Sequence, residues 1–388
     1  MTQPAVIERE AEVVDQEKGQ VETGSEEDRL YVASQWQLMW WRFRKHKLAL
    51  GSAVIIIFLY ILALFCEFLA PYDPHTRDVK YVHAPPQAIH FVGEDGFQLR
   101  PFVYDFKSER DPETYRMMFE VDKTKQYPIH FLVRGDPYKL WGLFETDVHL
   151  FGLKEEGQTV YLLGADRMGR DMLSRVFYGA RISLSIGLIG VALSFTLGIL
   201  IGGLSGYYGG AIDLVVQRVI EFIRSIPTIP LWMALGAALP DDWSPIKIYF
   251  SISIILSSIG WATLARVVRG KFISLREEDF VLAARLVGSS ELRIITKHLV
   301  PSFLSYLIAR VTVSIPWMIL SETSLSFLGL GLRPPAISWG VLLQEAQNIR
   351  SVALAPWLLS PGFFVVIAIL CFNFVGDGMR DAADPYAR

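Results

Sequence analysis

The sequence predicts an all-α polytopic membrane protein with six transmembrane helices and a small β-rich insertion outside the membrane. The composition is one reason: 52% of the 388 residues are hydrophobic, only 20% are charged, and the mean hydropathy is +0.32. Such a chain is too apolar for an ordinary soluble domain. The second reason is six apolar stretches of bilayer-spanning length, and the third is a long polar stretch, 71–180, between the first two of them.

The first 47 residues predict two cytoplasmic segments. Residues 1–35 are rich in Glu and have no aromatic residue before Tyr31, which favours a disordered acidic tail, although a functional tail stays open. Residues 36–47 interleave Trp40, Trp41 and Phe43 with basic residues, the pattern of an amphipathic segment at a membrane surface.

The predicted spans are 48–70, 182–204, 212–239, 248–268, 303–320 and 357–375. The first is about 35 Å long at roughly 1.5 Å per residue, enough to cross the hydrocarbon core. Charges within the spans are expected close to their ends, as with Glu67 in the first and Asp213 in the third.

The distribution of basic residues predicts the orientation. Arg42, Arg44, Lys45 and Lys47 precede the first span, and a second basic group lies between the fourth and fifth spans. The loop between the third and fourth spans instead carries Asp241 and Asp242. By the positive-inside rule both termini are cytoplasmic.

The second span carries small residues at intervals of four, namely Gly190, Ser194, Gly198, Gly202 and Gly206. Such a ridge lies on one helix face and lets a neighbouring backbone approach closely. We therefore expect this face to pack against another helix.

The stretch 71–180 predicts a small β-rich extracytoplasmic domain. Aromatic runs at 102–106, 127–131 and 159–161 are typical of strands, and 135–137 and 156–157 of turns. The domain could dock a binding protein or passively cover a channel mouth, and the sequence leaves both open.

A polar, basic loop between the fourth and fifth spans predicts a helix–glycine–helix element. It begins at Asp279, and its residues Phe280, Ala283, Ala284 and Val287 share one helix face. Gly288 can end that helix in a left-handed conformation, Ser289 is a candidate N-cap for a second helix, and Pro301 precedes the fifth span. Such an element, with small alanines on its apolar face, can insert into a groove of another protein.

These residues carry a resemblance to a known family. Ala283, Ala284, Gly288 and Pro301 are similar in register to the coupling-loop signature of ABC-importer permeases, whereas Leu282, His298 and Val300 replace its Glu, Ile and Leu. The stretches 69–74, 163–171, 325–331 and 376–381 also resemble the C-type permease subunit of the dipeptide/oligopeptide/nickel family.

The resemblance implies a type I ABC importer permease fold in the bacterial cytoplasmic (inner) membrane. Its divisions would be the tail 1–35, the amphipathic segment 36–47, the first transmembrane helix 48–70, the insertion and pre-helix segment 71–180, the permease core 181–376 with coupling loop 270–301, and a cytoplasmic tail 377–388. The implied partners are a second (B-type) permease, two cytoplasmic ABC ATPases, an extracytoplasmic solute-binding protein and membrane lipid.

Several functions are excluded or left open. The balanced net charge of −3 gives no reason to expect nucleic acid. The sequence has no G-x-x-x-x-G-K-[ST] loop, so ATP and Mg²⁺ are expected on the partner ATPases and no cofactor or metal on this chain. Peptides are the favoured substrates, with α-galactoside-type oligosaccharides or nickel as alternatives. A membrane-embedded enzyme is disfavoured because no nucleophile–base pair is visible in the spans.

Four ionisable residues are candidates for the translocation pathway or its outer gate. Glu322 lies at the outer end of the fifth span, where it could line the pathway or, as we favour, hold a helix end by hydrogen bonds. Asp166, Arg170 and Asp171 could form an outer gate or an ion-pair network that stabilises a loop.

Overall fold

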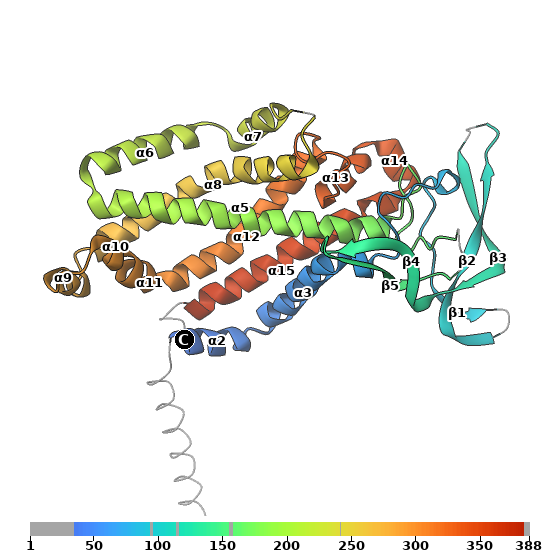
Figure 1. The fold of residues 1–388 in the computed structure, drawn as a ribbon, viewed down its shortest axis with the longest axis horizontal. Helices are drawn as coiled ribbons and strands as arrows, with labels where there is room; N and C mark the ends of the chain where they lie inside the picture. Colours follow the sequence, from blue (N-terminus) through green and yellow to red (C-terminus); the bar gives the residue numbers. More distant parts are fainter. Residues whose placement is uncertain (1–34, 94–95, 114–115, 155–157, 241, 384–388) are drawn as a thin grey trace, which may run out of the picture.

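The computed structural model describes residues 35–93, 96–113, 116–154, 158–240 and 242–383. It is a bundle of long helices with the β strands at one end and the short helices α9 and α10 at the other, which we call the β end and the α9 end (Figure 1). The tail predicted for 1–35 lies, except for Gln35, outside the described residues, and so does the predicted turn at 156–157.

The helical elements, in chain order, are α2 (Gln35–Lys45), α3 (Lys47–Leu64), α4 (Cys66–Leu69), η1 (Val79–Tyr81), α5 (Met172–Tyr208), α6 (Gly210–Ser225), α7 (Thr228–Ala237), α8 (Pro245–Leu275), α9 (Asp279–Leu286), α10 (Glu291–Ile294), the π turn η2 (Ile295–Leu299), α11 (Val300–Ser302), α12 (Leu304–Phe327), α13 (Trp339–Gln344), η3 (Glu345–Gln347), α14 (Ile349–Leu354), η4 (Pro356–Leu359) and α15 (Ser360–Ala383).

Among the described residues, five helical segments are long and apolar enough to cross a membrane: α3, α5, α8, α12 and the segment from η4 through α15. The stretch 212–239, predicted as one span, is not a single straight helix, because α6 and α7 meet at an angle of 82°. Pro227 explains the break, since proline disfavours helical backbone at the preceding residue, and Ile226 is extended with ψ 129°. If the bent pair counts as one span, the number of spans is six.

The other spans also differ from the prediction at their ends. The span predicted at 48–70 is interrupted at Phe65, which separates α3 from α4. The last helix, α15, continues to Ala383, beyond the predicted end at 375. The segment 36–47 is largely helical in α2, where Met39 and Phe43 are buried while Trp36 and Trp40 are exposed, as an amphipathic helix requires.

The insertion contains two antiparallel sheets. Strands β1 (His90–Gly93), β2 (Gly96–Arg110) and β3 (Met117–Pro128) form the first, and β4 (His130–Leu140) pairs with β5 (Phe144–Gly152) in the second. The turn predicted at 135–137 is wrong: these residues bulge within β4, between the pairs Arg134–Val148 and Tyr138–Thr146. The stretch 159–161, predicted as a strand, has no regular structure.

The β4–β5 hairpin is attached to the end of the first spanning helix. The indole N–H of Trp141, at the hairpin turn, donates to the carbonyl of Leu64 over 2.8 Å. The imidazole of His149 lies between two backbone carbonyls, with Nδ1 2.6 Å from that of Ala70 and Nε2 2.9 Å from that of Asp136. The β4–β5 sheet is therefore fixed to the bundle at the point where the chain passes from the first spanning helix into the insertion.

The predicted ridge of small residues is the contact between α5 and α8. A Cβ atom added to Gly206 would lie 2.7 Å from the carbonyl oxygen of Arg269, and one added to Gly198 would lie 2.8 Å from a methyl carbon of Leu264. Towards the β end the same ridge meets α12, where Gly190 faces Met318. The prediction that this face packs closely against a neighbour is confirmed.

Replacing Gly206 by leucine should destabilise the bundle by about 3 kcal/mol or more, because the obstacle is backbone, which cannot move aside as a side chain can. The measurement is thermal unfolding of the purified protein in detergent. Gly270→Leu is the matched control, since nothing lies within 4 Å of a Cβ added there. Equal unfolding temperatures for the two variants would contradict close packing at Gly206.

Candidate functional site

The α9 end carries the predicted helix–glycine–helix element. Helix α9 ends in a Schellman motif: the N–H of Gly288 donates to Arg285, and that of Ser289 donates to Ala284. Gly288 has a φ of +79°, the left-handed conformation that the sequence predicted. The chain therefore reverses sharply at the glycine.

The second half of the element differs from the prediction. Ser290, rather than Ser289, is the N-cap residue of α10, and its side chain accepts no capping hydrogen bond. Glu291 follows in the first turn and accepts a hydrogen bond of 2.7 Å from the hydroxyl of Tyr208, the last residue of α5. Pro301 lies within α11, ahead of α12.

Apolar side chains of this element divide between two faces. Val281, Ile294 and Leu299 are fully buried and join the main core. The exposed apolar residues, which we call the α9 tip, are Phe280 (40% exposed), Leu282 (41%), Leu286 (89%), Val287 (85%) and Leu292 (71%). Nothing in the described chain covers them, and exposed apolar patches of this kind mark contacts with another protein or with a membrane.

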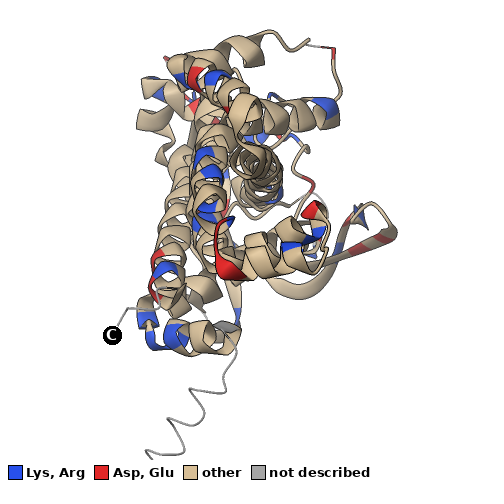
Figure 2. Ribbon diagram, turned by 90° about the vertical axis from the view of Figure 1, so that its left-hand side faces the viewer, with Lys and Arg blue, Asp and Glu red and all other residues tan. Residues whose placement is uncertain are grey.

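The α9 tip only partly coincides with the predicted face. Phe280, Ala283 and Val287 are exposed as expected, but Ala284 is half-buried against the core. The helical spacing does not single out Leu286, the most exposed residue of the tip, because spacing alone does not show which face of α9 packs against the core. Figure 2 views the molecule from this end, with acidic and basic positions coloured.

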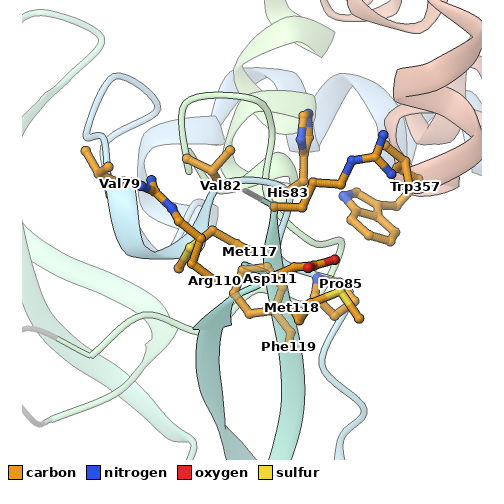
Figure 3. A pocket seen from close by; sticks show the side chains of 12 residues that line it. Val79, Val82, His83, Pro85, Arg110, Asp111, Met117, Met118, Phe119 and Trp357 are labelled. Atoms are coloured by element: carbon orange, nitrogen blue, oxygen red, sulfur yellow. The ribbon is translucent and has the colours of Figure 1, made fainter. Parts of the chain in front are cut away.

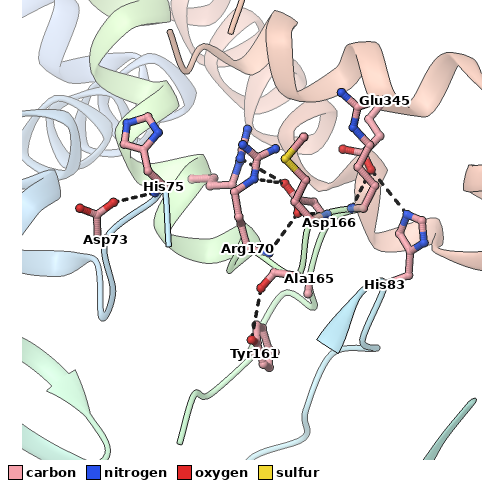
Figure 4. Close-up of polar contacts among 12 residues, drawn as sticks. Asp73, His75, His83, Tyr161, Ala165, Asp166, Arg170 and Glu345 are labelled. Carbon is pink, nitrogen blue, oxygen red and sulfur yellow. Dashed lines mark hydrogen bonds and ion pairs between the residues drawn. The ribbon is translucent and has the colours of Figure 1, made fainter. Parts of the chain in front are cut away.

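Two of the predicted outer-gate residues, Asp166 and Arg170, lie at the β end in an ion-pair network (Figure 4). Asp166 is 1% exposed; its carboxylate accepts from Arg170 Nε over 2.7 Å and lies 3.1 Å from Nη1 of Arg175. It also accepts from the backbone N–H groups of Met168 and Arg170. One carboxylate thus shapes the loop that leads into α5.

Asp171 does separate work as the N-cap of α5. Its carboxylate accepts hydrogen bonds from the N–H groups of Leu173 and Ser174 and from the Ser174 hydroxyl. Burial raises the pKa of Asp171 to about 6, against the lowering effect of these hydrogen bonds.

Contacts around Asp166 join four parts of the chain. Glu345, in η3, accepts from the N–H of Arg167 over 2.8 Å and lies 3.5 Å from Nε2 of His83 (Figure 4). The indole of Trp357, in η4, donates to the carbonyl of Ala165 over 2.9 Å. These bonds tie the segment before β1 and the start of α5 to η3 and η4.

Glu322 is fully buried between helices. It accepts hydrogen bonds from Ser183 of α5 over 3.1 Å and from Ser326 of its own helix over 2.8 Å. The Ser183 hydroxyl in turn accepts from the backbone N–H of Trp339 in α13. The geometry agrees with the hydrogen-bonded helix-end role that the sequence favoured.

One charged residue within a span lies away from the span ends, contrary to the sequence prediction. Arg310 is exposed and lies well inside α12, so the expectation that charges lie near the span ends is wrong for the fifth span. The signal was present in the sequence as an arginine within an otherwise apolar stretch.

A hollow of about 600 Å³ opens at the β end, beside the Asp166 network (Figure 3). It is lined by Val79, Val82, His83, Pro85, Arg110, Asp111, Arg116, Met117, Met118, Phe119, Leu354 and Trp357. Strands β2 and β3 form one wall and Trp357 of the bundle another, so the hollow marks the junction between insertion and bundle. Among the described residues, no group of three or more His, Cys, Asp or Glu side chains could hold a metal ion.

Asp166→Asn should lower the free energy of unfolding by about 3–5 kcal/mol, because the buried guanidinium of Arg175 and the half-buried one of Arg170 lose their anionic partner. Glu221→Gln is the control: it removes an acid from the exposed pair with Arg218, worth about 0.5 kcal/mol or less. Chemical denaturation in mild detergent measures both. An Asp166 variant as stable as the Glu221 variant would show that the network is not structural.

Two family models match this chain, one on each side of the inserted β sheets. The family model described as binding-protein-dependent transport system inner membrane component matches residues 198–388. A second model, the N-terminal TM domain of oligopeptide transport permease C, matches residues 34–86. The two β sheets lie in the unmatched segment between them.

Relatives match over longer stretches. The oligopeptide transport system permease protein OppC of Haemophilus influenzae is 38% identical over 245 residues, which are 63% of this chain and 76% of the relative. The dipeptide transport system permease protein DppC of Lactococcus lactis is 32% identical over 90% of each chain. Among solved structures, the inward-facing MetNI methionine ABC transporter gives a TM-score of 0.43 at 18% identity, over 55% of this chain and 98% of that chain. The family models and the relatives show that the chain belongs to the binding-protein-dependent transport permeases, in the branch of the C-type subunits of ABC importers.

Proposed function

We propose that this permease moves short peptides into the cytoplasm, driven by ATP that separate subunits hydrolyse. The observation that carries the proposal is the α9 tip, an apolar surface of five exposed side chains that nothing in the described chain covers. The relatives of this chain are named as oligopeptide and dipeptide permeases, which supports peptides rather than oligosaccharides or nickel as its substrates.

The geometry of the two ends supports a proposal for the partners. The α9 tip would seat in a groove of a cytoplasmic ATPase, which would hold ATP and Mg²⁺. The basic residues near α2 and α9 support a cytoplasmic location for that end by the positive-inside rule. The β end would then face the outside of a bacterial inner membrane, where a solute-binding protein delivers the peptide. A second, B-type permease would complete the channel, and movement of the tip would alternate its access.

The Schellman motif and the buried residues Val281 and Ile294 support the mechanical part of this proposal. They fix the tip to the core while leaving its apolar side free, so a displacement of the tip is transmitted to α8 and α12 rather than absorbed by a flexible loop. The bond from Tyr208 to Glu291 adds a direct link to α5.

The test is uptake into proteoliposomes that hold this chain with its second permease, ATPases and binding protein. We expect ATP-dependent uptake of short peptides, with raffinose and Ni²⁺ neither transported nor competing. Leu286→Asp should lower uptake and stimulated ATP hydrolysis at least about tenfold, because it places a charge at the centre of an apolar contact. Ile349→Asp, at an equally exposed leucine-sized residue of the β end, is the control. Transport of raffinose or nickel instead of peptides would refute the substrate class.

A second test concerns the angle between α9 and α10. Gly288→Val should reduce ATPase stimulation, because a β-branched residue in the left-handed region costs about 1–2 kcal/mol and would change the turn. Gly288→Asn should retain most of it, since asparagine tolerates that conformation. Space is not the issue, as nothing lies within 4 Å of an added Cβ. Equal stimulation in both variants would show that the turn is not required.

A further inference from the structure

Arg310 carries a positive charge on a membrane-spanning helix, and no ion pair among the described residues neutralises it. In the described part of the chain, no acidic side chain lies within ion-pair distance of its guanidinium. This distinguishes Arg310 from Arg181 and Arg269, which lie on other spanning helices and pair with Glu67 and Asp213.

The side chain of Arg310 lines a hollow of about 450 Å³ between α12 and α15. Ser314 and Trp317 follow it at helical spacing on the same face of α12, and Asn373 of α15 completes the polar lining. Trp317 is 62% exposed. The hollow therefore combines one cation, a hydroxyl, an amide and an aromatic surface.

Lipid is a poor neighbour for this face. A guanidinium directed at hydrocarbon is strongly unfavourable, and charged residues within spans almost always face a bundle interior or a water-filled cavity. In an assembled importer this face of α12 and α15 would thus line the cavity through which the substrate passes.

We propose that Arg310 binds the C-terminal carboxylate of a peptide as it crosses the membrane. Guanidinium groups bind carboxylates through paired N–H donors, and an unpaired Arg has both donors available. Asn373 supplies an amide donor and acceptor for the peptide backbone, and Trp317 an apolar surface for a side chain. The Ser314 hydroxyl donates to the backbone carbonyl of Arg310 over 2.8 Å, so it offers the peptide an acceptor only. This inference rests on the proposed function and adds a requirement to it: the permease itself distinguishes a free carboxylate from a neutral end.

The experiment compares two forms of one tripeptide, with a free C-terminal carboxylate and with a C-terminal amide, in the complete reconstituted transporter. The same binding protein is used throughout, so its own preference cancels when variants are compared. In Arg310→Gln we expect the ratio of free-acid to amide uptake to fall at least about tenfold, the size expected for loss of a charge-assisted hydrogen bond. Amide uptake should stay within about twofold of the unmodified protein.

Two further variants control the result. Arg310→Lys keeps the charge but loses the paired donors, so its ratio of free-acid to amide uptake should lie between those of the unmodified protein and Arg310→Gln. Arg350→Gln removes the same charge from an exposed site on α14 and should leave the ratio unchanged.

Other outcomes overturn the inference. An unchanged ratio of free-acid to amide uptake in Arg310→Gln would show that Arg310 does not bind the carboxylate. Equal loss of both peptides, with the second permease no longer co-purifying, would assign Arg310 to the contact between permeases instead. If the unmodified transporter moves neither peptide, the proposed function itself fails, and that result is distinct because it does not depend on the variant.

Discussion

The close approach of α5 to α8 is the constraint on which the rest of the structure depends. Gly202 and Gly206 let the two backbones come so near that even one methyl group would collide with backbone atoms of Ala265 or Arg269. Lipid offers helices little hydrophobic drive to associate, so van der Waals contact between such surfaces supplies much of the association energy. The ridge therefore fixes the position of α5, and α5 positions both ends of the molecule.

Helix α5 connects the two candidate functional regions directly. It has 37 residues, about 55 Å at 1.5 Å per residue, longer than a membrane core is thick. Asp171 caps it beside the Asp166 network, and Tyr208 at its other end bonds to Glu291 beneath the α9 tip. A rigid rod with hydrogen-bonded contacts at both ends can carry a displacement from one side of the membrane to the other, which a set of loosely packed helices could not.

Features set by local sequence could be predicted, and those set by distant contacts could not. The left-handed Gly288 and the small-residue ridge depend on residue type and helical spacing alone, so both were correctly predicted. Gly-Asp-Pro at 135–137 predicts a turn but suits a bulge equally well, and only pairing with β5 decides between the two. The break at Ile226 is predictable from Pro227, which disfavours helical backbone at the residue before it. The rotation of α9, which exposes Leu286, depends on how Val281 packs in a core assembled from other helices.

Ionisable residues inside the membrane divide into two groups. Those whose charge or hydrogen-bonding capacity is used by other groups of the chain are structural, and those left without such partners point to transport. Glu322 is fully buried, and hydroxyl donors from α5 and α12 surround its carboxylate, so its hydrogen-bonding capacity is used in packing. Arg310, also on α12, is exposed to a hollow and has no acidic partner within the described chain. An ionisable group that the fold leaves unpaired at that depth requires a partner from outside the chain. In a protein that carries cargo across the membrane, the cargo is the partner that arrives and leaves, and so the unsatisfied residue is the better guide to the pathway.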